Sequence, residues 1–429
     1  MTRPAIRMLV WFALITLFLI AGIALFLLPP KTSIGHTVTF SDGTTMTLRQ
    51  VTYGTEHSYY EKQIWRRVVS LLPRKLIEKL GVKRSVMKVS RPSVVFWLER
   101  RGNGLASGDP QLVLCDADGF GISSGYSMMR VGPPGNCVEG WASEFWPRRE
   151  GTFRLQIYEP GPRYPEADLI GEFFVRNPTP GNYPQWAARP LPQTAIEGDL
   201  SVTLFDLTAG VGRGANNWRP ARNPTVSQTR AGFRVARNGS PTREWEIASV
   251  EARDATGNVI ASLWSSSPEP EVEFGELQPH PWPAESAWKL RVGFSQRSNF
   301  GASEIWNLRG VALSGTNSTE GVLETNLQGA VLQYTGQARR PGLPGDRHFN
   351  FRVKPGRPDY EITLVKAVDD QGQEAELANS FVSQSERTFS LRVNASVQSL
   401  DFTLALHRTR YFEFLARPEV ISTNRINAR

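Results

Sequence analysis

The sequence has few of the residues that most often carry metal or redox chemistry. Its 429 residues include two cysteines and five histidines. The histidines are scattered without the spacing of metal ligands, and we expect them to be surface or loop residues. They are His36, His57, His280, His348 and His407. The sequence therefore predicts no metal and no other cofactor.

The two cysteines leave two interpretations open. Cys115 and Cys137 close a short loop. In an oxidising compartment, one disulfide across a loop of that size would stabilise the fold by about 3 kcal/mol. The alternative is a pair of buried thiols, because two cysteines alone do not determine pairing.

Helical periodicity is also scarce. Glycine and proline are plentiful, at 37 and 30 residues, and many segments alternate apolar with polar residues. This pattern predicts a mainly β fold. The exception is the segment 61–80, in which apolar residues recur at helical spacing opposite a basic face. We expect two short amphipathic helices there, inserted in the first module.

Two placements of these amphipathic helices are open. A basic amphipathic helix near a membrane anchor can lie in the lipid headgroup layer. The side chains that would form this membrane surface are Trp65, Arg66, Arg67, Arg74, Lys75 and Lys79. The alternative is that the apolar stripe packs on the first module while the charges are solvated.

An evenly spread positive charge is missing as well. The net charge is +8, but residues 61–101 alone hold nine more basic than acidic residues. The rest of the chain is therefore close to neutral. Because no basic stripe extends through it, the composition argues against a nucleic-acid partner.

One long hydrophobic run is present, and no second run of that length follows. Residues 8–28 contain no charged residue, and about 20 apolar residues suffice to cross a bilayer core. The run is longer than the apolar part of a cleavable signal, so we expect an uncleaved, single-pass anchor. Arg3 and Arg7 precede it and Lys31 alone follows it closely. This favours a short cytoplasmic tail, residues 1–7, and an extracytoplasmic bulk, periplasmic or at the cell surface.

A loose pattern recurs three times after the anchor. Each copy has a strand, the turn sequence Asp-x-x-Gly, a second strand and later an aromatic-x-Leu-x-apolar strand. The turns begin at Asp116, Asp254 and Asp369, and each predicts a β-hairpin, because Asp opens the turn and Gly supplies positive φ. A last alternating strand is expected to close each copy, at residues 173–178, 305–313 and 412–418.

These repeats predict three immunoglobulin-like β-sandwich modules. We expect the first at residues 32–178, the second at 194–314 and the third at 320–418. A proline-rich linker, residues 179–193, would separate the first two modules, and residues 419–429 would form a C-terminal tail.

The short motifs do not predict a catalytic centre. Residues 121–125 match Gly-x-Ser-x-Gly, but that motif needs a strand-to-helix turn in an α/β sheet. Asp116 and Asp118 could begin a calcium loop, yet the bidentate acidic ligand is missing at the expected distance. A turn is favoured there.

Three tryptophans in long or proline-rich loops are candidate contacts to a ligand or partner. They are Trp186, Trp218 and Trp282. Exposed aromatic side chains can stack on sugars or anchor a protein partner. The alternative is that each ring covers an edge of its own module.

The segments VTYGTEHSYY (51–60) and SVVFWLERRG (93–102), with the helical segment between them, resemble a pattern in bacterial single-pass membrane-anchored proteins of uncharacterised function. The resemblance covers the first third of the chain and singles out Tyr53, Gly54 and His57. It implies an exported, anchored architecture with immunoglobulin-like modules, and it implies no activity or substrate.

The expected function is therefore non-catalytic. We expect an integral, single-pass envelope protein whose modules bind or scaffold another protein or a glycan. One alternative is the ectodomain of a sensor or accessory subunit that acts through a membrane partner, because so short a cytoplasmic tail cannot signal alone. A hydrolase with a site built from loops is a third.

Overall fold

The computed structural model describes the greater part of the chain. The described residues are 37–60, 84–102, 109–123, 127–133, 135–160, 168–213, 218–220, 228–269, 272–313, 323–327, 329–339, 346–354, 359–383, 386–394 and 396–420. They form mainly strands, so the predicted mainly β class is confirmed. Within these ranges the only helix is a short 3-10 turn, η2 (Ala302–Glu304).

Several sequence predictions fall outside the described residues. They concern the anchor at 8–28, the tail at 1–7 and the amphipathic segment 61–80 with Trp65 and its basic neighbours. Across the described ranges, none of the helices has the length and apolar character needed to span a bilayer.

The chain divides into two compact units. Unit 1 contains Met1–Pro184, Ala221–Val226 and Thr256–Val259. Unit 2 contains Gln185–Pro220, Ser227–Ala255 and Ile260–Arg429. The division after Pro184 falls inside the segment predicted as a linker.

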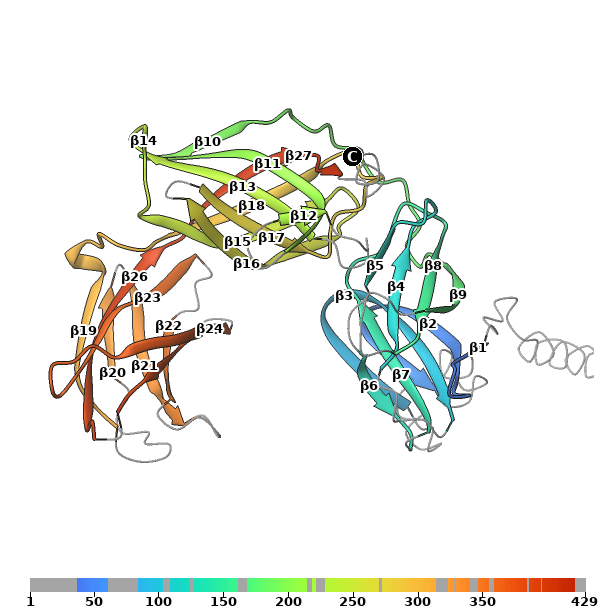
Figure 1. Cartoon of the computed structure of the whole chain (residues 1–429), viewed down its shortest axis with the longest axis horizontal. Helices are drawn as coiled ribbons and strands as arrows, with labels where there is room; N and C mark the ends of the chain where they lie inside the picture. Colours follow the sequence, from blue (N-terminus) through green and yellow to red (C-terminus); the bar gives the residue numbers. More distant parts are fainter. Residues whose placement is uncertain are drawn as a thin grey trace, which may run out of the picture. The chain divides into compact units, whose positions relative to one another are not determined.

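Unit 1 contains two antiparallel sheets (Figure 1), with strand orders β1-β2-β3-β7-β6 and β5-β4-β8-β9. The first sheet consists of β1 (Thr37–Thr39), β2 (Thr45–Tyr60), β3 (Arg84–Arg101), β6 (Ser127–Val131) and β7 (Asn136–Ser143). The second consists of β4 (Gln111–Cys115), β5 (Gly121–Ser123), β8 (Thr152–Tyr158) and β9 (Leu169–Arg176).

Alternating apolar residues form the core between these two sheets. Phe153, Leu155 and Ile157 of β8 are all buried, as the aromatic-x-Leu-x-apolar pattern predicted. The Phe153 ring meets the Phe96 ring of β3 edge to face, with centroids 6.2 Å apart. This contact joins one sheet to the other.

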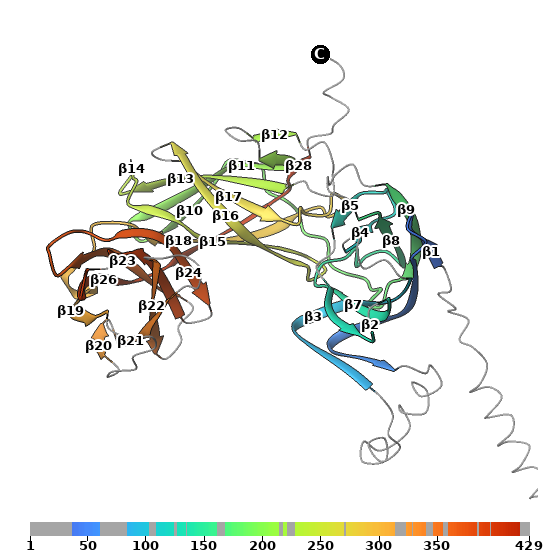
Figure 2. The same ribbon diagram turned by 60° about the horizontal axis from the view of Figure 1, so that its bottom comes forward.

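Unit 2 contains a large sheet, here called the middle sheet, with strand order β10-β11-β13-β17-β16-β15-β18-β27. Short strands β12 and β28 pair with β11, and β14 pairs with β13; Figure 2 shows β28 beside β11. The strands are β10 (Gln193–Glu197), β11 (Leu200–Arg213), β12 (Trp218–Pro220), β13 (Gln228–Arg237), β14 (Ser240–Pro241), β15 (Trp245–Asp254), β16 (Val259–Glu269), β17 (Val272–Gln278), β18 (Trp288–Gln296), β27 (Arg410–Ala416) and β28 (Glu419–Val420).

The middle sheet is rolled so that its first and last strands approach each other. The Arg189 N–H donates to the Leu415 carbonyl at 2.8 Å, and the Gln193 side chain bonds both main-chain groups of Leu415. Inside the roll, Phe233 packs against Phe294 and Phe414, with ring centroids 6.0 Å away in each case. One sheet thus supplies both walls of this core.

The remaining strands of unit 2 form a second pair of sheets, with orders β19-β26-β23 and β20-β21-β22-β25-β24. They are β19 (Ile305–Ala312), β20 (Leu323–Leu327), β21 (Ala330–Arg339), β22 (Asp346–Lys354), β23 (Tyr360–Asp369), β24 (Glu376–Ser383), β25 (Glu386–Arg392) and β26 (Ser399–Arg408). Phe349 and Phe351 of β22 pack on Phe402 of β26, with centroids 4.9 and 5.6 Å away.

Two strands do not close the modules to which the sequence pattern assigned them. The segment 305–313, expected to complete the second module, forms β19 and pairs with β26 of the last sheet pair. The segment 412–418, expected to complete the third, lies largely in β27 and pairs with β18 of the middle sheet. Figure 1 shows the chain passing from β26 into β27. The alternating pattern fixes which face is buried but not which sheet receives the strand.

The three Asp-x-x-Gly turns also differ. The first joins the paired strands β4 and β5, and the second joins the neighbouring strands β15 and β16. The third has the expected turn, with Gly372 at φ 79°, but β23 and β24 then enter different sheets. Just after the turn, Val368 bridges Glu374, the Asp369 N–H donates to the Gln373 carbonyl at 2.8 Å and the Ala375 N–H donates to the Ala367 carbonyl at 2.9 Å. For the third copy, the predicted turn forms, but the prediction that its two strands pair as a continuing hairpin is wrong.

Candidate functional site

The predicted cysteine pair is not bridged. Cys115 and Cys137 are free and buried, and they belong to different sheets of unit 1. The Cys115 thiol lies 3.1 Å from Gln156 Oε1. Burial raises the pKa of Cys115 to about 12 and also raises the pKa of Cys137. Both groups are therefore protonated, weakly nucleophilic thiols at neutral pH.

The three candidate tryptophans are not equivalent. Trp282 is 3% exposed, which favours the alternative that its ring covers an edge of its own module. Trp186 is half-buried, with the Lys289 ammonium 5.9 Å from its ring. Trp218 lies in β12, and its side chain is outside the described residues. The proline-rich sequence around Trp282 was therefore no guide to the solvent exposure of its side chain.

The prediction that the histidines are surface or loop residues is wrong for His57 and His407, which are buried in β2 and β26, whereas His280 lies in the predicted loop but is also buried. His57, His280 and His407 are each at most 1% exposed. Burial lowers the pKa of all three, to about 3 for His280 and about 4 for His407. They are therefore neutral at pH 7. A neutral imidazole can be buried where a charged one would be costly.

His57 belongs to a small polar group inside unit 1. Its Nδ1 is 2.9 Å from Thr52 Oγ1, which accepts a hydrogen bond from the Trp97 indole at 3.0 Å. The Tyr59 ring stacks on Trp97 with centroids 5.3 Å apart. These contacts link strands β2 and β3. They give His57, one of the positions singled out by the resemblance, a structural role.

A buried carboxylate lies elsewhere in the same sheet. Glu139 of β7 is 0% exposed and accepts hydrogen bonds from Arg130 Nε at 2.9 Å and Trp141 Nε1 at 3.2 Å. The Arg100 guanidinium lies 4.0 Å away. The charge of Glu139 is thus compensated, as a buried carboxylate requires.

The residues of the Asp-x-x-Gly turn and of the Gly-x-Ser-x-Gly motif make local structural contacts. The Asp116 carboxylate accepts the Phe120 N–H at 2.7 Å and so stabilises its own turn. Ser123 lies in β5 and is 3.4 Å from the Gln111 side chain. In the part of the chain that the structure describes, no group of three or more His, Cys, Asp or Glu side chains could hold a metal ion.

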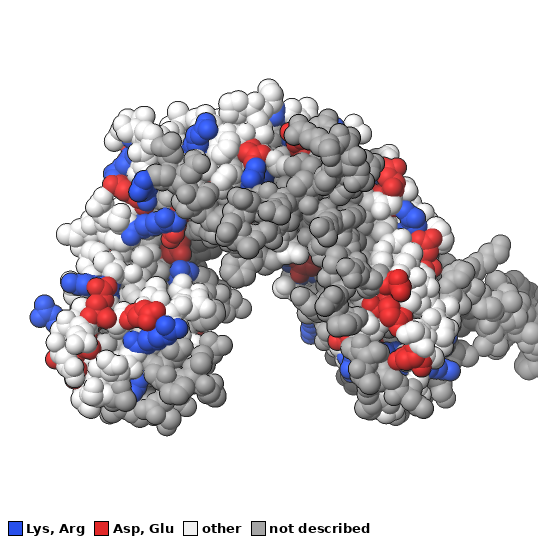
Figure 3. Space-filling model, in the orientation of Figure 1, with Lys and Arg blue, Asp and Glu red and all other residues white. Residues whose placement is uncertain are grey.

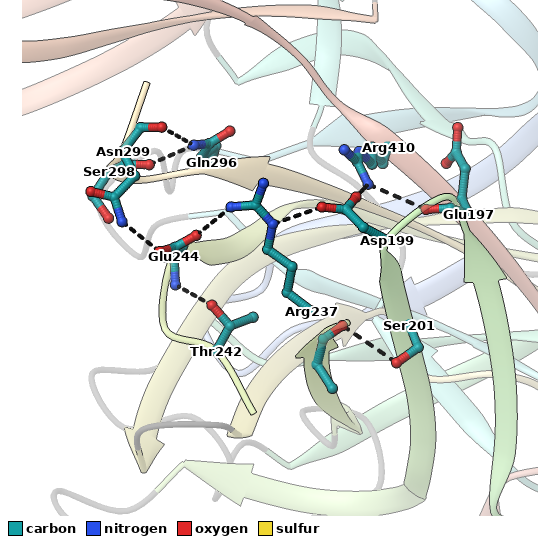
Figure 4. Close-up of polar contacts among 11 residues, drawn as sticks. Glu197, Asp199, Ser201, Arg237, Thr242, Glu244, Gln296, Ser298, Asn299 and Arg410 are labelled. Atoms are coloured by element: carbon teal, nitrogen blue, oxygen red, sulfur yellow. Dashed lines mark hydrogen bonds and ion pairs between the residues drawn. The ribbon is translucent and has the colours of Figure 1, made fainter. Parts of the chain in front are cut away.

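A group of four charged side chains lies in unit 2, where the chain passes between the middle sheet and the last sheet pair. We call Asp199, Arg237, Glu244 and Arg410 the junction cluster (Figure 4). Asp199 accepts hydrogen bonds from Arg237 at 2.7 Å and from Arg410 at 2.6 Å. Arg237 also donates to Glu244 at 2.9 Å.

Each member of the junction cluster comes from a strand end or a turn. Asp199 lies between β10 and β11, Arg237 ends β13, Glu244 precedes β15 and Arg410 begins β27. The Arg410 guanidinium also lies 4.8 Å from the Trp245 ring. Hydrogen bonds from the two arginines lower the pKa of Asp199 to about 2. The cluster therefore fastens the start of β27 to three other segments of the middle sheet.

A second polar group lies at the same passage. Arg387 and Glu361 are 3.3 Å apart. Burial raises the pKa of Glu361, while Arg387 and a hydrogen bond from Ser295 act in the opposite direction. His407, the cross-strand neighbour of Glu361, is 2.9 Å from Thr363 Oγ1 and packs on the Phe300 ring. Ser295 belongs to β18, so this group also joins the two halves of unit 2.

The sequence does not indicate either of these groups, because their members are far apart in the chain and follow no motif. On the face drawn in Figure 3, basic and acidic side chains lie next to each other rather than in separate patches. In the junction cluster, each carboxylate is bonded to an arginine, so the charges serve to hold strands together.

Comparison with known proteins gives no further guide to function. No family model, curated protein or solved structure matches the chain.

Proposed function

We propose that the protein is a membrane-anchored, extracytoplasmic component of the cell envelope that binds or scaffolds another molecule without catalysing a reaction. The hydrophobic run at 8–28 supports the anchor. The exchange of β19 and β27 between the two halves of unit 2 supports the scaffold, and it is the observation that carries the proposal.

A scaffold must hold its binding surfaces in a fixed arrangement, and two covalent crossings do this better than one. In unit 2 the chain leaves the middle sheet after β18 and returns to it as β27. Pulling the last sheet pair away would remove β27 from its ladder with β18 and break the junction cluster. Immunoglobulin-like modules are the architecture we propose for each sheet pair, on the basis of the repeated strand pattern.

Labelling of one introduced cysteine in intact cells tests on which side of the membrane the folded part of the chain lies. Ser240→Cys places a thiol on an exposed residue of β14. After the outer barrier is permeabilised, we expect a membrane-impermeant maleimide to label this variant. The unaltered chain is the matched control, because both native thiols are buried and should not react.

Two results would contradict the proposal. One is labelling of Ser240→Cys only after the inner membrane has been lysed, which would place the bulk in the cytoplasm. The other is release of the chain from washed membranes by carbonate extraction, which would exclude an integral anchor.

A further inference from the structure

The outer face of the middle sheet carries an aromatic and arginine surface that is separate from the junction cluster. A β-bulge in β11 follows Leu204, and Leu204 and Leu207 are both buried in the core. Phe205 and Asp206, between them, therefore share the outer face. Bulges commonly redirect a side chain near functional surfaces.

Two phenylalanine rings meet over a glycine on this face. Phe205 of β11 and Phe274 of β17 have ring centroids 6.0 Å apart, and Gly232 of β13 lies beneath them. A Cβ atom at Gly232 would come within 2.8 Å of both rings. The rings thus occupy the space of a missing side chain, which fixes their positions.

An arginine lies against each ring, and the two arginines differ in what else they contact. The Arg230 guanidinium is 4.9 Å from the Phe274 ring and donates to Asp206 at 2.9 and 2.6 Å. The Arg234 guanidinium is 4.6 Å from the Phe205 ring and is exposed. Among the described residues, Arg234 has no hydrogen-bond or ion-pair partner for its side chain.

The strands next to Arg234 extend this surface. Thr194 of β10 and Thr203 of β11 lie in the same cross-strand row as Arg234, and their hydroxyls are 2.8 Å apart. Ile196, two residues along β10, is 73% exposed. We call Thr194, Ile196, Thr203, Phe205 and Arg234 the Arg234 platform.

We propose that the Arg234 platform is a docking site for an acidic segment of another protein that carries apolar side chains beside a carboxylate. The proposal rests on the proposed binding function and names the chemistry of the partner. A guanidinium stacked on a ring is oriented in advance and presents its free donors to a carboxylate in bidentate geometry. Ile196 and Phe205 supply the apolar contacts that surround such a pair in protein interfaces.

Charge complementarity decides the kind of partner. The neighbouring arginines Arg230 and Arg237 already have carboxylates within this chain, whereas Arg234 has none among the described residues. A neutral glycan would leave that charge unused, and a basic partner would be repelled by it. An acidic protein segment with apolar side chains can pair a carboxylate with the Arg234 guanidinium and also bury the exposed Ile196 side chain.

The test is photo-crosslinking in the native cell with benzoylphenylalanine in place of Thr194. We expect a protein adduct whose crosslinked peptide contains Asp or Glu beside apolar residues. Arg234→Gln should lower the adduct yield at least about tenfold, the loss expected for one interfacial charge pair. Arg309→Gln, an equal change at an exposed residue of β19, is the matched control and should leave the yield unchanged.

The outcomes separate the platform from the wider function. An unchanged yield in Arg234→Gln, an adduct with a glycan or with a second copy of the chain, or no adduct would each overturn the platform. Arg234→Gln removes no internal ion pair and only an exposed contact with the Phe205 ring, so its melting temperature should stay close to that of the unaltered chain, and a large drop would assign the arginine a structural role instead. If Ser240→Cys labels only from the cytoplasm while the Arg234-dependent adduct still forms, the extracytoplasmic function fails and the platform stands.

Discussion

His407 is a buried base at the passage between the two halves of unit 2, and its protonation should weaken the fold. Its pKa falls from an ordinary value of 6.5 to about 4 because burial disfavours the charged ring. The folded state therefore binds fewer protons than the unfolded state as the pH falls from 6.5 toward 4. The stability that His407 contributes in its neutral form is fully present above pH 6.5. As the pH falls from 6.5 to 4, the free energy of unfolding should decrease by up to about 3 kcal/mol.

This pH dependence is checked by urea unfolding at pH 7.5 and pH 4.5. His407→Gln cannot gain a proton, and its amide can still bond Thr363. We expect the free energy of unfolding to fall less on acidification in this variant than in the unaltered chain. His57 and His280 act in the same direction and should supply the remaining slope. Equal slopes in the two proteins would show that His407 is not the group responsible.

The cysteines offer a second prediction at this scale. Because Cys115 and Cys137 are buried thiols with raised pKa values, neither should react with Ellman's reagent at pH 8 in the folded protein. Both should react once the chain is unfolded in guanidinium without reductant. Mass spectrometry after alkylation counts the modified thiols. If the unfolded chain takes up no label until reductant is added, a disulfide is present and the thiol assignment is wrong.

Single residues were the least predictable level from sequence. Cys115 lies on one sheet and Cys137 on another, and short separation in the chain did not decide whether they meet. Trp282 stands in a proline-rich segment yet is buried. Burial of a side chain depends on what the rest of the chain lays over it, and local composition carries little of that information.

Strand β27 joins the middle sheet, so core residues on it should stabilise that sheet. Phe414 is buried against Phe233 of β13. Phe414→Ala should lower the free energy of unfolding by about 3–5 kcal/mol, the usual cost of removing a buried phenylalanine. Hydrogen exchange should speed up first in β13 and β18, while β22 and β25 stay protected.

Phe402→Ala is the matched control, because Phe402 lies on β26, just before β27, and packs on Phe349 and Phe351. This variant should release β22 and leave β13 protected. Faster exchange in β22 and β25 after Phe414→Ala, with β13 unaffected, would mean that β27 belongs to the last sheet pair.

At the scale of elements, faces were predictable and partners were not. Trp288, Leu290 and Val292 are all buried, as their alternation predicted. The same alternation in β19 and β27 could not show that the two strands exchange sheets. Likewise, Asp369 and Gly372 made the expected turn, but the strands after it diverged. A turn depends on local chemistry, whereas sheet membership depends on contacts far along the chain.

For the whole molecule, the strand exchange predicts how the chain can be divided. The sequence pattern suggests a cut between the second and third modules, at residues 315–319. A fragment 185–314 would keep β19 without its partner β26 and would leave the β18 edge open. A fragment 320–429 would lack β19 and would carry β27 with no sheet to join. We therefore expect neither fragment to unfold cooperatively when it is alone.

Mixing the two fragments should restore the fold, because each holds the strand that the other lacks. Nuclear magnetic resonance spectra of the separate fragments should show poor amide dispersion, and the equimolar mixture should show a dispersed spectrum and one complex by ultracentrifugation. The intact piece 185–429 is the control and should be folded. If each fragment were folded alone and the two did not associate, the exchanged strands would not hold the halves of unit 2 together, and the main support for a scaffolding role would be lost.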